Sequence, residues 1–248
     1  QREPPYPLQL LEKGFKVGVR LRQQRFEREE GMTTHLGVPV IVIGNLSVGG
    51  TGKTPFTVWL SRRLVEAGWR PGIITRGYGG RQGPTPLRVL KDTPFEAAGD
   101  EALLLAAQTE RPVAVYPRRV EAARFLLETT DSDILLADDG LQHYALGRDL
   151  EIALIDGTRG LGNGHCLPAG PLREPPERLK RVDWLVYTGS APQGEILMTL
   201  KGDEAVSLEN PKLKRPLASL RGSVVRAVAG IGNPERFFTH LRQPFARA

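Results

Sequence analysis

Short apolar runs alternate with stretches of helical periodicity through the middle of the chain. The runs are rich in valine, isoleucine and leucine and are bounded by glycine, proline or acidic residues, which is the pattern of buried strands. The stretches between them repeat apolar residues every three or four positions, as amphipathic helices do. We expect strands at 38–44, 70–75, 112–116, 133–139, 150–156 and 183–188, and helices at 54–67, 100–109 and 119–128. Strands that alternate with helices predict an α/β fold, a parallel sheet covered by helices on both faces.

Residues 8–28 precede this alternation and combine apolar and basic residues at roughly helical spacing. Two interpretations are open. The stretch could lie at a lipid headgroup surface, with its basic side chains meeting anionic lipid. It could instead be an ordinary amphipathic helix packed on the domain, and the stretch alone favours this second interpretation.

The alternation is lost near the C-terminal end of the chain. Residues 189–222 are rich in turn-forming residues, and the short runs between the turns predict an antiparallel extension or a linker. Residues 224–233 indicate a new strand followed by a glycine turn, as if another strand–helix unit began there. We therefore expect an N-terminal helical segment at 1–33, a core domain at 34–222, and the start of a second, smaller lobe at 223–248.

Composition and charge narrow the class of partner. The chain has 248 residues, 40% of them hydrophobic, which is enough to bury a core. The net charge of +6 suggests anionic lipid or phosphorylated substrates, while the scattered basic residues argue against nucleic acid. The single cysteine, Cys166, excludes an internal disulfide. No stretch approaches the ~20 apolar residues of a membrane span. The sequence leaves the oligomeric state open.

The segment SVGGTGKT lies between an expected strand and an expected helix, where a phosphate-binding loop belongs. Its glycines would let backbone N–H groups turn toward phosphate oxygens at a helix N-terminus. Lys53 would meet the outer phosphates, and the Thr54 hydroxyl would ligate Mg²⁺. Ser47 replaces the first glycine of the usual loop pattern. The expected nucleotide site comprises Ser47, Val48, Gly49, Gly50, Thr51, Gly52, Lys53 and Thr54.

Two pairs of acidic residues lie at the ends of expected elements, one at the end of a strand and one at the start of a helix. Asp138 and Asp139 end an apolar strand, where this type of fold places a carboxylate beside its metal ion. One of the two would contact Mg²⁺ or its water, and the other would orient a neighbour, although either could be a turn cap. Asp100 and Glu101 open a helix. They could cap it, or a carboxylate there could accept the proton of a substrate hydroxyl, and the residues alone leave both roles open.

Further polar residues follow other strands. Arg76 and Tyr78 come after one strand and are expected at the same sheet edge. Arg159 and Arg173 lie in a long glycine- and proline-rich loop and are candidate anion contacts, because a guanidinium suits phosphate geometry. His143 is expected to hydrogen-bond near the acidic pair, since the histidine spacing matches no zinc pattern.

Several motifs together resemble the tetraacyldisaccharide 4′-kinase family, the lipid A kinases of Gram-negative bacteria. They are VIVIGNLSVGGTGKTP, ITRGYGG, GDEALLL, ADDGLQHYALGRDLEIALIDGTRGLGNG, LPAGPLREP and AGIGNPERFF, in family order from about 38 to 238. The resemblance implies a P-loop NTPase-like fold and ATP-dependent phosphorylation of the 4′-hydroxyl of a lipid-anchored glucosamine disaccharide 1-phosphate. It implies Mg²⁺ and a place at the cytoplasmic face of the bacterial inner membrane, and it favours membrane attachment through residues 8–28.

The same resemblance implies roles for individual residues. Asp100 becomes the general base, with Glu101 beside it in the acceptor site. Lys53 would stabilise charge on the transferred phosphoryl group, and Asp139 is counted with them among the catalytic residues. Thr54, Asp138 and Asp139 would surround the metal ion. The residues implied to contact the substrate are Arg76, Tyr78, Glu101, Arg119, Gln142, His143 and Arg173.

One departure from the family leaves alternatives open. The chain ends where the family's second lobe begins, and that lobe normally closes over the nucleotide and carries a further histidine. We therefore expect a C-terminally truncated family member. A truncated or non-catalytic nucleotide- or lipid-binding lobe is one alternative. A partition-type ATPase is another, although its loop needs a lysine where this chain has Val48.

Overall fold

The computed structural model describes residues 3–29, 31–81, 83–200, 202–210, 212–230 and 234–245. The chain divides into two compact units, residues 1–198 and 199–248. The N-terminal helix therefore belongs to the same unit as the sheet. The division expected from the sequence, with boundaries at 33–34 and 222–223, stays a prediction.

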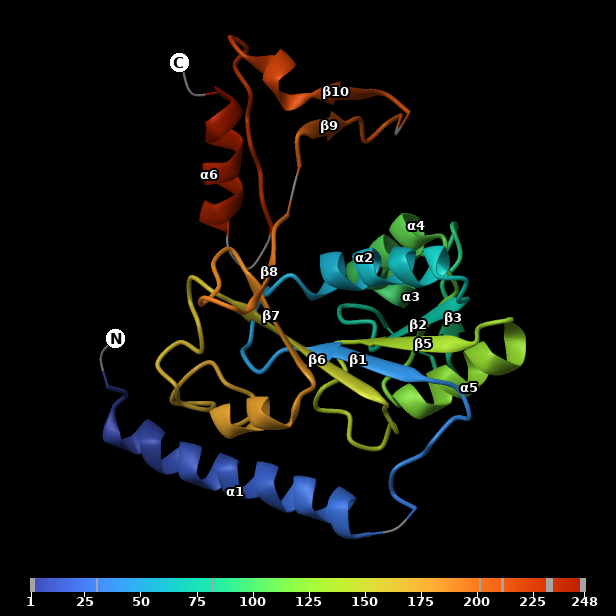
Figure 1. Cartoon of the computed structure of the whole chain (residues 1–248), viewed down its shortest axis with the longest axis vertical. Helices are drawn as coiled ribbons and strands as arrows, with labels where there is room; N and C mark the ends of the chain where they lie inside the picture. The colour runs from blue at the N-terminus through green and yellow to red at the C-terminus, as the bar shows by residue number, and fades with distance from the viewer. Residues whose placement is uncertain are drawn as a thin grey trace. The chain divides into compact units, whose positions relative to one another are not determined.

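The first unit is built around an eight-stranded sheet with the order β3-β4-β2-β5-β1-β6-β7-β8 (Figure 1). Every pairing is parallel except that of β3 with β4. The strands are β1 (Val40–Gly44), β2 (Pro71–Thr75), β3 (Leu87–Arg88), β4 (Val113–Val115), β5 (Ile134–Asp138), β6 (Leu150–Asp156), β7 (Trp184–Thr188) and β8 (Ile196–Met198). The expected α/β fold with a mostly parallel sheet is confirmed.

Helices cover both faces of this sheet, with α2, α3 and α4 on one face and α5 on the other (Figure 1). They are α2 (Lys53–Glu66), α3 (Phe95–Ala98), α4 (Asp100–Thr109), α5 (Arg119–Thr129) and the 3₁₀ helix η1 (Pro176–Arg181). Neighbouring residues of β1 enter opposite cores, since Val42 is buried in the cluster that contains α5 and Ile43 in the cluster that contains α2 and α4. This alternation is why the strands are apolar along their whole length.

The central strand β1 lies between β5 and β6 and sets the position of the site. Ile43 is level with Asp138 on β5 and with Ile152 on β6. Because the carboxyl ends of parallel strands meet at one edge of the sheet, the segments that follow β1 and β5 begin side by side.

The N-terminal helix α1 (Tyr6–Arg28) has an unusual distribution of polar and apolar side chains. Phe15 packs against the cluster that contains α5, but the buried residue of the helix is Glu12. Leu10, Val17 and Leu21 are more than half exposed. The helix thus docks through a buried carboxylate and partly buried apolar side chains such as Phe15, and it also presents other apolar side chains outward.

Glu12 accepts three hydrogen bonds, from the Cys166 backbone N–H at 2.8 Å, from His165 Nδ1 at 2.7 Å and from Lys16 Nζ at 2.6 Å. Burial acts to raise the pKa of Glu12, but these three bonds outweigh it and lower the pKa to about 2. None of the described helices combines the length and the apolar character that a membrane span requires.

The second unit contains a two-stranded antiparallel ribbon of β9 (Glu204–Val206) and β10 (Lys214–Pro216), the 3₁₀ helix η2 (Leu217–Leu220) and α6 (Pro234–Phe245). The ribbon matches the antiparallel extension expected within 189–222, whereas β8 in the same range is a parallel edge strand of the main sheet.

The strand expected at 224–233 is wrong over residues 224–230, which form no strand. Val224 and Val228 are largely exposed, so no neighbouring surface buries them. A β-branched sequence forms a strand only where a partner strand or a core receives it. The remaining residues, 231–233, lie outside the described ranges.

Candidate active site at the carboxyl edge of the sheet

The loop after β1 turns into α2 through glycines in left-handed conformations. Gly49 has φ 100° and Gly52, the N-cap of α2, has φ 88°. A Cβ atom on Gly52 would stand 2.9 Å from Met198 Cε, so a side chain there would be both strained and crowded. Within the part of the chain that the structure describes, no backbone N–H from Gly49 to Thr54 donates a hydrogen bond. Such a row of N–H groups at a helix N-terminus is an anion-binding arrangement.

A second segment holds this loop from the side. The Val48 backbone N–H donates to the Pro171 carbonyl at 2.8 Å, and the Arg173 N–H donates to the Leu46 carbonyl at 2.7 Å. The backbone N–H of Val48 is therefore already hydrogen-bonded within the protein and is not available to an anion. The glycine- and proline-rich segment delivers Arg173 directly beside the phosphate loop.

Arg159 lies at the outer side of the loop. Its Nη2 donates to the Gly50 carbonyl at 2.6 Å, and its Nε donates to Asp156 Oδ2 at 3.0 Å. Asp156, at the end of β6, also accepts from the Arg159 N–H at 3.2 Å. The guanidinium expected to contact an anion is thus engaged with the loop backbone, and its contact with an anion stays a prediction.

Lys53 points between two acceptors. Its Nζ donates to Asn45 Oδ1 at 3.1 Å and lies 3.5 Å from Asp139 Oδ1, with only 12% of the side chain exposed. Asn45 is fully buried, and its Nδ2 donates to the Gly49 carbonyl at 3.3 Å. The lysine is held next to the loop by one neutral and one charged partner.

Asp138 is buried at the end of β5, and its two carboxylate oxygens differ. Oδ1 accepts a 2.9 Å hydrogen bond from Thr57 Oγ1, whereas Oδ2 has no hydrogen-bond partner among the described residues. Burial raises the pKa of Asp138 to about 6, against the opposing effects of Lys53 and Thr57. Thr54 lies one helical turn before Thr57 on the same face of α2. A buried, unpartnered carboxylate oxygen beside a threonine hydroxyl suits Mg²⁺, which prefers hard oxygen ligands.

Asp139 has a left-handed backbone, with φ 50°. Its side chain can therefore leave the strand in a different direction from that of Asp138. Arg173 Nη1 lies 2.9 and 3.0 Å from the two Asp139 oxygens, and Arg119 Nη2 donates to the Asp139 carbonyl at 3.4 Å. Burial acts to raise the pKa of Asp139, but Lys53 and Arg173 outweigh it and hold the pKa below its ordinary value. Asp139 is the anionic centre around which the cations gather.

The two acids that open α4 have different surroundings. Asp100 is exposed, and its Oδ1 accepts the Glu101 N–H at 2.9 Å. Glu101 is partly buried, and burial raises its pKa, opposed first by the charge of Lys53 and supported by that of Asp139. The start of α4 therefore lies within electrostatic reach of the phosphate loop. Asp100 accepts this bond as the first residue of α4, but the N-cap is Gly99 and no side-chain hydrogen bond from the described residues caps the helix. The Asp100 carboxylate is open to solvent, and its role as general base stays a prediction.

The loop after β2 meets α4 through a close backbone approach. A Cβ atom on Gly99, which has φ 80°, would stand 2.2 Å from the Tyr78 carbonyl oxygen, so only glycine fits there. The Tyr78 side chain is 76% exposed. The charge of Arg76 contributes to lowering the pKa of Arg119, which burial lowers to about 10. Arg76 and Tyr78 thus belong to the same edge of the sheet as the acids.

Gln142 and His143 follow the acidic pair. The Gln142 Nε2 donates to the Asn45 carbonyl at 3.2 Å, and Arg173 Nη1 lies 3.5 Å from Gln142 Oε1. Burial lowers the pKa of His143 to about 4, and the charge of Arg119 adds to this effect, so the ring is neutral at physiological pH.

The structure thus gathers the expected site residues at one edge of the sheet, while their individual roles stay predictions. Three residues that contact this group were not singled out from the sequence, namely Asn45, Thr57 and Glu174. Asn45 directly follows the glycine that ends β1, and Glu174 directly follows Arg173, so adjacency to a candidate was the signal available for both. Thr57 could have been found from its position one turn after Thr54.

Comparison with known proteins places this arrangement in a family. A family model described as tetraacyldisaccharide-1-P 4′-kinase matches residues 6–247. A tetraacyldisaccharide 4′-kinase of Nitrosococcus oceani is 50% identical over 228 residues, which cover 92% of this chain and 67% of that protein. The one of Azotobacter vinelandii is 47% identical over 237 residues, covering 94% and 71%.

A solved structure agrees with these relatives. The crystal structure of the "apo" form of LpxK from Aquifex aeolicus in complex with ATP matches with a TM-score of 0.78 and 28% identity, covering 94% of this chain and 76% of that one. The family expected from the motifs is confirmed. The chain belongs to the tetraacyldisaccharide-1-P 4′-kinase family.

Proposed function

We propose that this chain transfers the γ-phosphate of Mg·ATP to the 4′-hydroxyl of a tetraacyldisaccharide 1-phosphate, through the residues gathered at the carboxyl edge of the sheet. The observation that carries the proposal is the position of Lys53, 3.5 Å from Asp139 and directly after a loop whose N–H groups from Gly49 onward donate no bond among the described residues. Phosphoryl transfer requires mainly alignment and stabilisation of charge on the phosphoryl oxygens, and a lysine with a row of N–H groups supplies both.

Magnesium is part of the proposal. Thr54 and Asp138 would hold the ion, with Asp139 beside it, because Asp138 Oδ2 is a buried oxygen without a partner among the described residues. When bound, Mg²⁺ would supply neutralisation of the negative charge on the phosphate oxygens. Arg173 and Arg119 bind and orient Asp139, which keeps its carboxylate next to Lys53.

Asp100 is proposed as the general base. Its solvent-accessible carboxylate would take the proton of the 4′-hydroxyl as that oxygen attacks the γ-phosphorus and ADP leaves. Glu101 would stand next to the acceptor. Arg76, Tyr78, Gln142 and His143 are proposed to contact the sugar or its phosphate.

Attachment to an anionic membrane surface through α1 completes the proposal. Tyr6, Leu10, Val17 and Leu21 are exposed along the helix, and Lys13 and Arg20 are exposed beside them. An apolar stripe flanked by basic side chains suits a helix that lies at the headgroup level. A lipid-linked acceptor is reached from the cytoplasmic face of the inner membrane, where ATP is available.

The test is transfer of labelled phosphate from Mg·ATP to a lipid A disaccharide precursor in detergent micelles. The 248-residue chain is run beside a version that continues beyond residue 248. Lys53→Ala is expected to abolish transfer in the active form, whereas Lys91→Ala, at an exposed turn, leaves it unchanged. Transfer by the longer form alone would mean that this chain is an incomplete enzyme. ATP binding without transfer by either form would contradict the proposal and favour a non-catalytic binding lobe.

A further inference from the structure

A buried carboxylate lies behind the candidate active site. Glu174 directly follows Arg173, is 2% exposed, and has hydrogen-bond partners on both of its carboxylate oxygens. A carboxylate at this depth requires full hydrogen bonding, because an ion taken out of water loses its solvation. The hydrogen-bond partners of Glu174 therefore identify the side chains whose positions it fixes.

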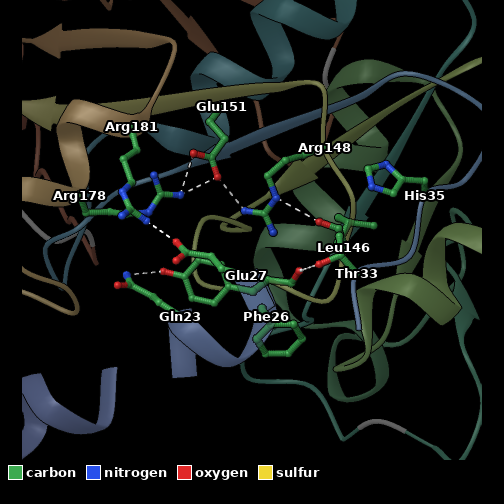
Figure 2. Close-up of a pocket in the computed structure, with 11 residues that line it drawn as sticks. Gln23, Phe26, Glu27, Thr33, His35, Leu146, Arg148, Glu151, Arg178 and Arg181 are labelled. Atoms are coloured by element: carbon green, nitrogen blue, oxygen red, sulfur yellow. Dashed lines mark hydrogen bonds and ion pairs between the residues drawn. The ribbon is translucent and has the colours of Figure 1, made fainter. Parts of the chain in front are cut away.

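One oxygen of Glu174 is directed toward the N-terminal helix. The Tyr144 hydroxyl donates a hydrogen bond to Oε1. Gln23 of α1 donates through Nε2 to the Tyr144 Oη at 2.8 Å and to Glu174 Oε1 at 3.3 Å. Figure 2 shows this part of α1, where Gln23 and Glu27 line a cavity of about 260 Å³ together with Arg178 and Arg181, and Glu27 pairs directly with Arg181. The docked end of α1 thus supplies part of the hydrogen bonding of Glu174.

The other oxygen is directed toward the site. Gln142 Nε2 donates to Glu174 Oε2 at 3.4 Å and to the Asn45 carbonyl at 3.2 Å. Two acceptors on the same side fix which end of the Gln142 amide is the NH₂ group. Oε1 of Gln142 must then face the opposite way, where Arg173 Nη1 lies 3.5 Å from it.

From Gln142 the contacts continue to the phosphate loop by two routes. Arg173 reaches both carboxylate oxygens of Asp139, and the side chain of Asn45 accepts from Lys53 Nζ. The Gln142 amide therefore contacts two residues of the site, the Asn45 backbone and the Arg173 guanidinium. Asn45 in turn contacts Lys53, and Arg173 contacts Asp139.

We propose that Glu174 is a positioning residue of the kinase, which orients the Gln142 amide and thereby Arg173 and Asn45, with Gln23 of α1 and Tyr144 as its outer support. This inference rests on the proposed function. It assigns the docked helix α1 a second role, since the same helix that presents apolar side chains outward supports a hydrogen-bond network that ends at Lys53.

A purely electrostatic role for Glu174 is the alternative to consider. Arg178 Nε lies 3.6 Å from Glu174 Oε2, so the carboxylate could serve simply to neutralise that cation. Arg178 already has a better partner, because its Nη2 donates to both oxygens of Glu151 at 2.6 and 2.7 Å. Glu151 is itself buried and does not contact Gln142. Glu151→Gln is therefore the matched control, because it also neutralises a buried carboxylate that pairs with Arg178.

Glu174→Gln keeps the shape of the side chain but replaces one acceptor oxygen with a donor NH₂. It can no longer accept from Tyr144 and Gln142 together, so the Gln142 amide is free to turn over. We expect kcat/KM for the lipid acceptor to fall about tenfold, because one oriented contact is lost. Glu151→Gln is expected to lower the melting temperature comparably while changing kcat/KM less than about twofold. Tyr144→Phe removes only the hydroxyl that joins Gln23 of α1 to Glu174, and we expect it to lower kcat/KM less than Glu174→Gln does.

The deciding measurement is a double-mutant cycle, made in whichever form of the chain transfers phosphate. If Glu174 acts through Gln142, then adding Glu174→Gln to a Gln142→Ala variant changes kcat/KM less than about twofold. A full tenfold loss in the Gln142→Ala background, or an equal loss in Glu151→Gln, overturns the proposal. Failure of the proposed function is distinguishable, because the unmodified protein would then transfer no phosphate at all.

Discussion

The Thr57 hydroxyl of α2 donates a 2.9 Å hydrogen bond to Asp138 Oδ1 at the end of β5. This bond joins the helix that begins at the phosphate loop to the strand that carries the acidic pair. It also uses one carboxylate oxygen and leaves the other without a hydrogen-bond partner among the described residues. The position of the Asp138 carboxylate is therefore fixed before any ion binds, which is the form of preorganisation that a metal-dependent transfer requires.

We predict that Asp138→Asn lowers phosphate transfer about a hundredfold or more and raises the Mg²⁺ concentration needed for half-maximal rate, because the amide is a weaker ligand than the carboxylate. Titration of the rate with Mg²⁺ at fixed ATP measures this effect. Thr57→Val serves as the graded control, since it removes the orienting bond and keeps the charge, and we expect a loss of about three- to tenfold. An unchanged Mg²⁺ titration in Asp138→Asn would show that the ion is held elsewhere.

Arg159 is predicted to act on ATP binding through the loop backbone. Arg159→Gln removes the charged bond to the Gly50 carbonyl, and we expect the KM for ATP to rise about five- to tenfold with a smaller change in kcat. Steady-state kinetics with varied ATP provide the measurement. Arg62→Ala is a suitable control, because Arg62 is also exposed and donates to a carbonyl, that of Gln108, away from the loop. A fall in kcat at constant KM would instead assign Arg159 to the transfer step.

The two acids of α4 can be separated by their kinetic effects. Asp100→Asn is predicted to lower kcat by a factor of about 10²–10⁴ with little change in ATP affinity, because a general base acts on the acceptor. Glu101→Gln should chiefly raise the KM for the lipid acceptor. Rapid-mix kinetics together with an ATP-binding titration distinguish the two. An equal loss of turnover and ATP affinity in Asp100→Asn would mean that this residue has a structural role or touches the nucleotide.

The parallel strands β1, β2 and β4 to β7 and the position of the site were predictable from local sequence signals, whereas the short edge strands β3 and β8 were not. Buried strands ending in glycine or aspartate, with a glycine-rich loop opening a helix, define the carboxyl edge without any long-range information. The contacts that complete the site were not predictable in this way. Gln142 and Asn45 are 97 positions apart, and Glu12 and Cys166 are 154 apart, so no spacing rule joins them.

The packing of the N-terminal helix was also only partly predictable from the sequence. Its periodicity indicated an amphipathic helix, and the usual expectation is that the apolar stripe faces the core. The described residues show apolar side chains on two sides of the helix, because Phe15, Val19 and Phe26 are partly buried on the side of Glu12 while Leu10 and Leu21 are exposed. Helical spacing identifies the stripes of a helix but not which stripe docks, because docking here depends on partners supplied by a distant loop.

The ionisation of Glu12 is predicted to make the docking of α1 dependent on pH. The pKa of Glu12 is lowered in the folded protein from an ordinary value of 4.5 to about 2. The unfolded chain therefore binds a proton more readily, and the stability that Glu12 contributes is fully present above about pH 4.5 and is lost as the pH falls toward 2. Denaturant unfolding at a series of pH values measures this contribution.

Glu12→Gln should lower the free energy of unfolding at pH 7 by about 1–3 kcal/mol, since it weakens hydrogen bonds to a charged group. The difference between the two proteins should shrink as the pH falls from 4.5 to 2, where the unmodified side chain is also becoming neutral. Glu27→Gln on the same helix removes an exposed ion pair with Arg181 and should change stability by less than about 1 kcal/mol at any pH. A Glu12→Gln deficit that stayed constant over this range would mean that packing of α1, rather than the charge of Glu12, holds the helix on the core.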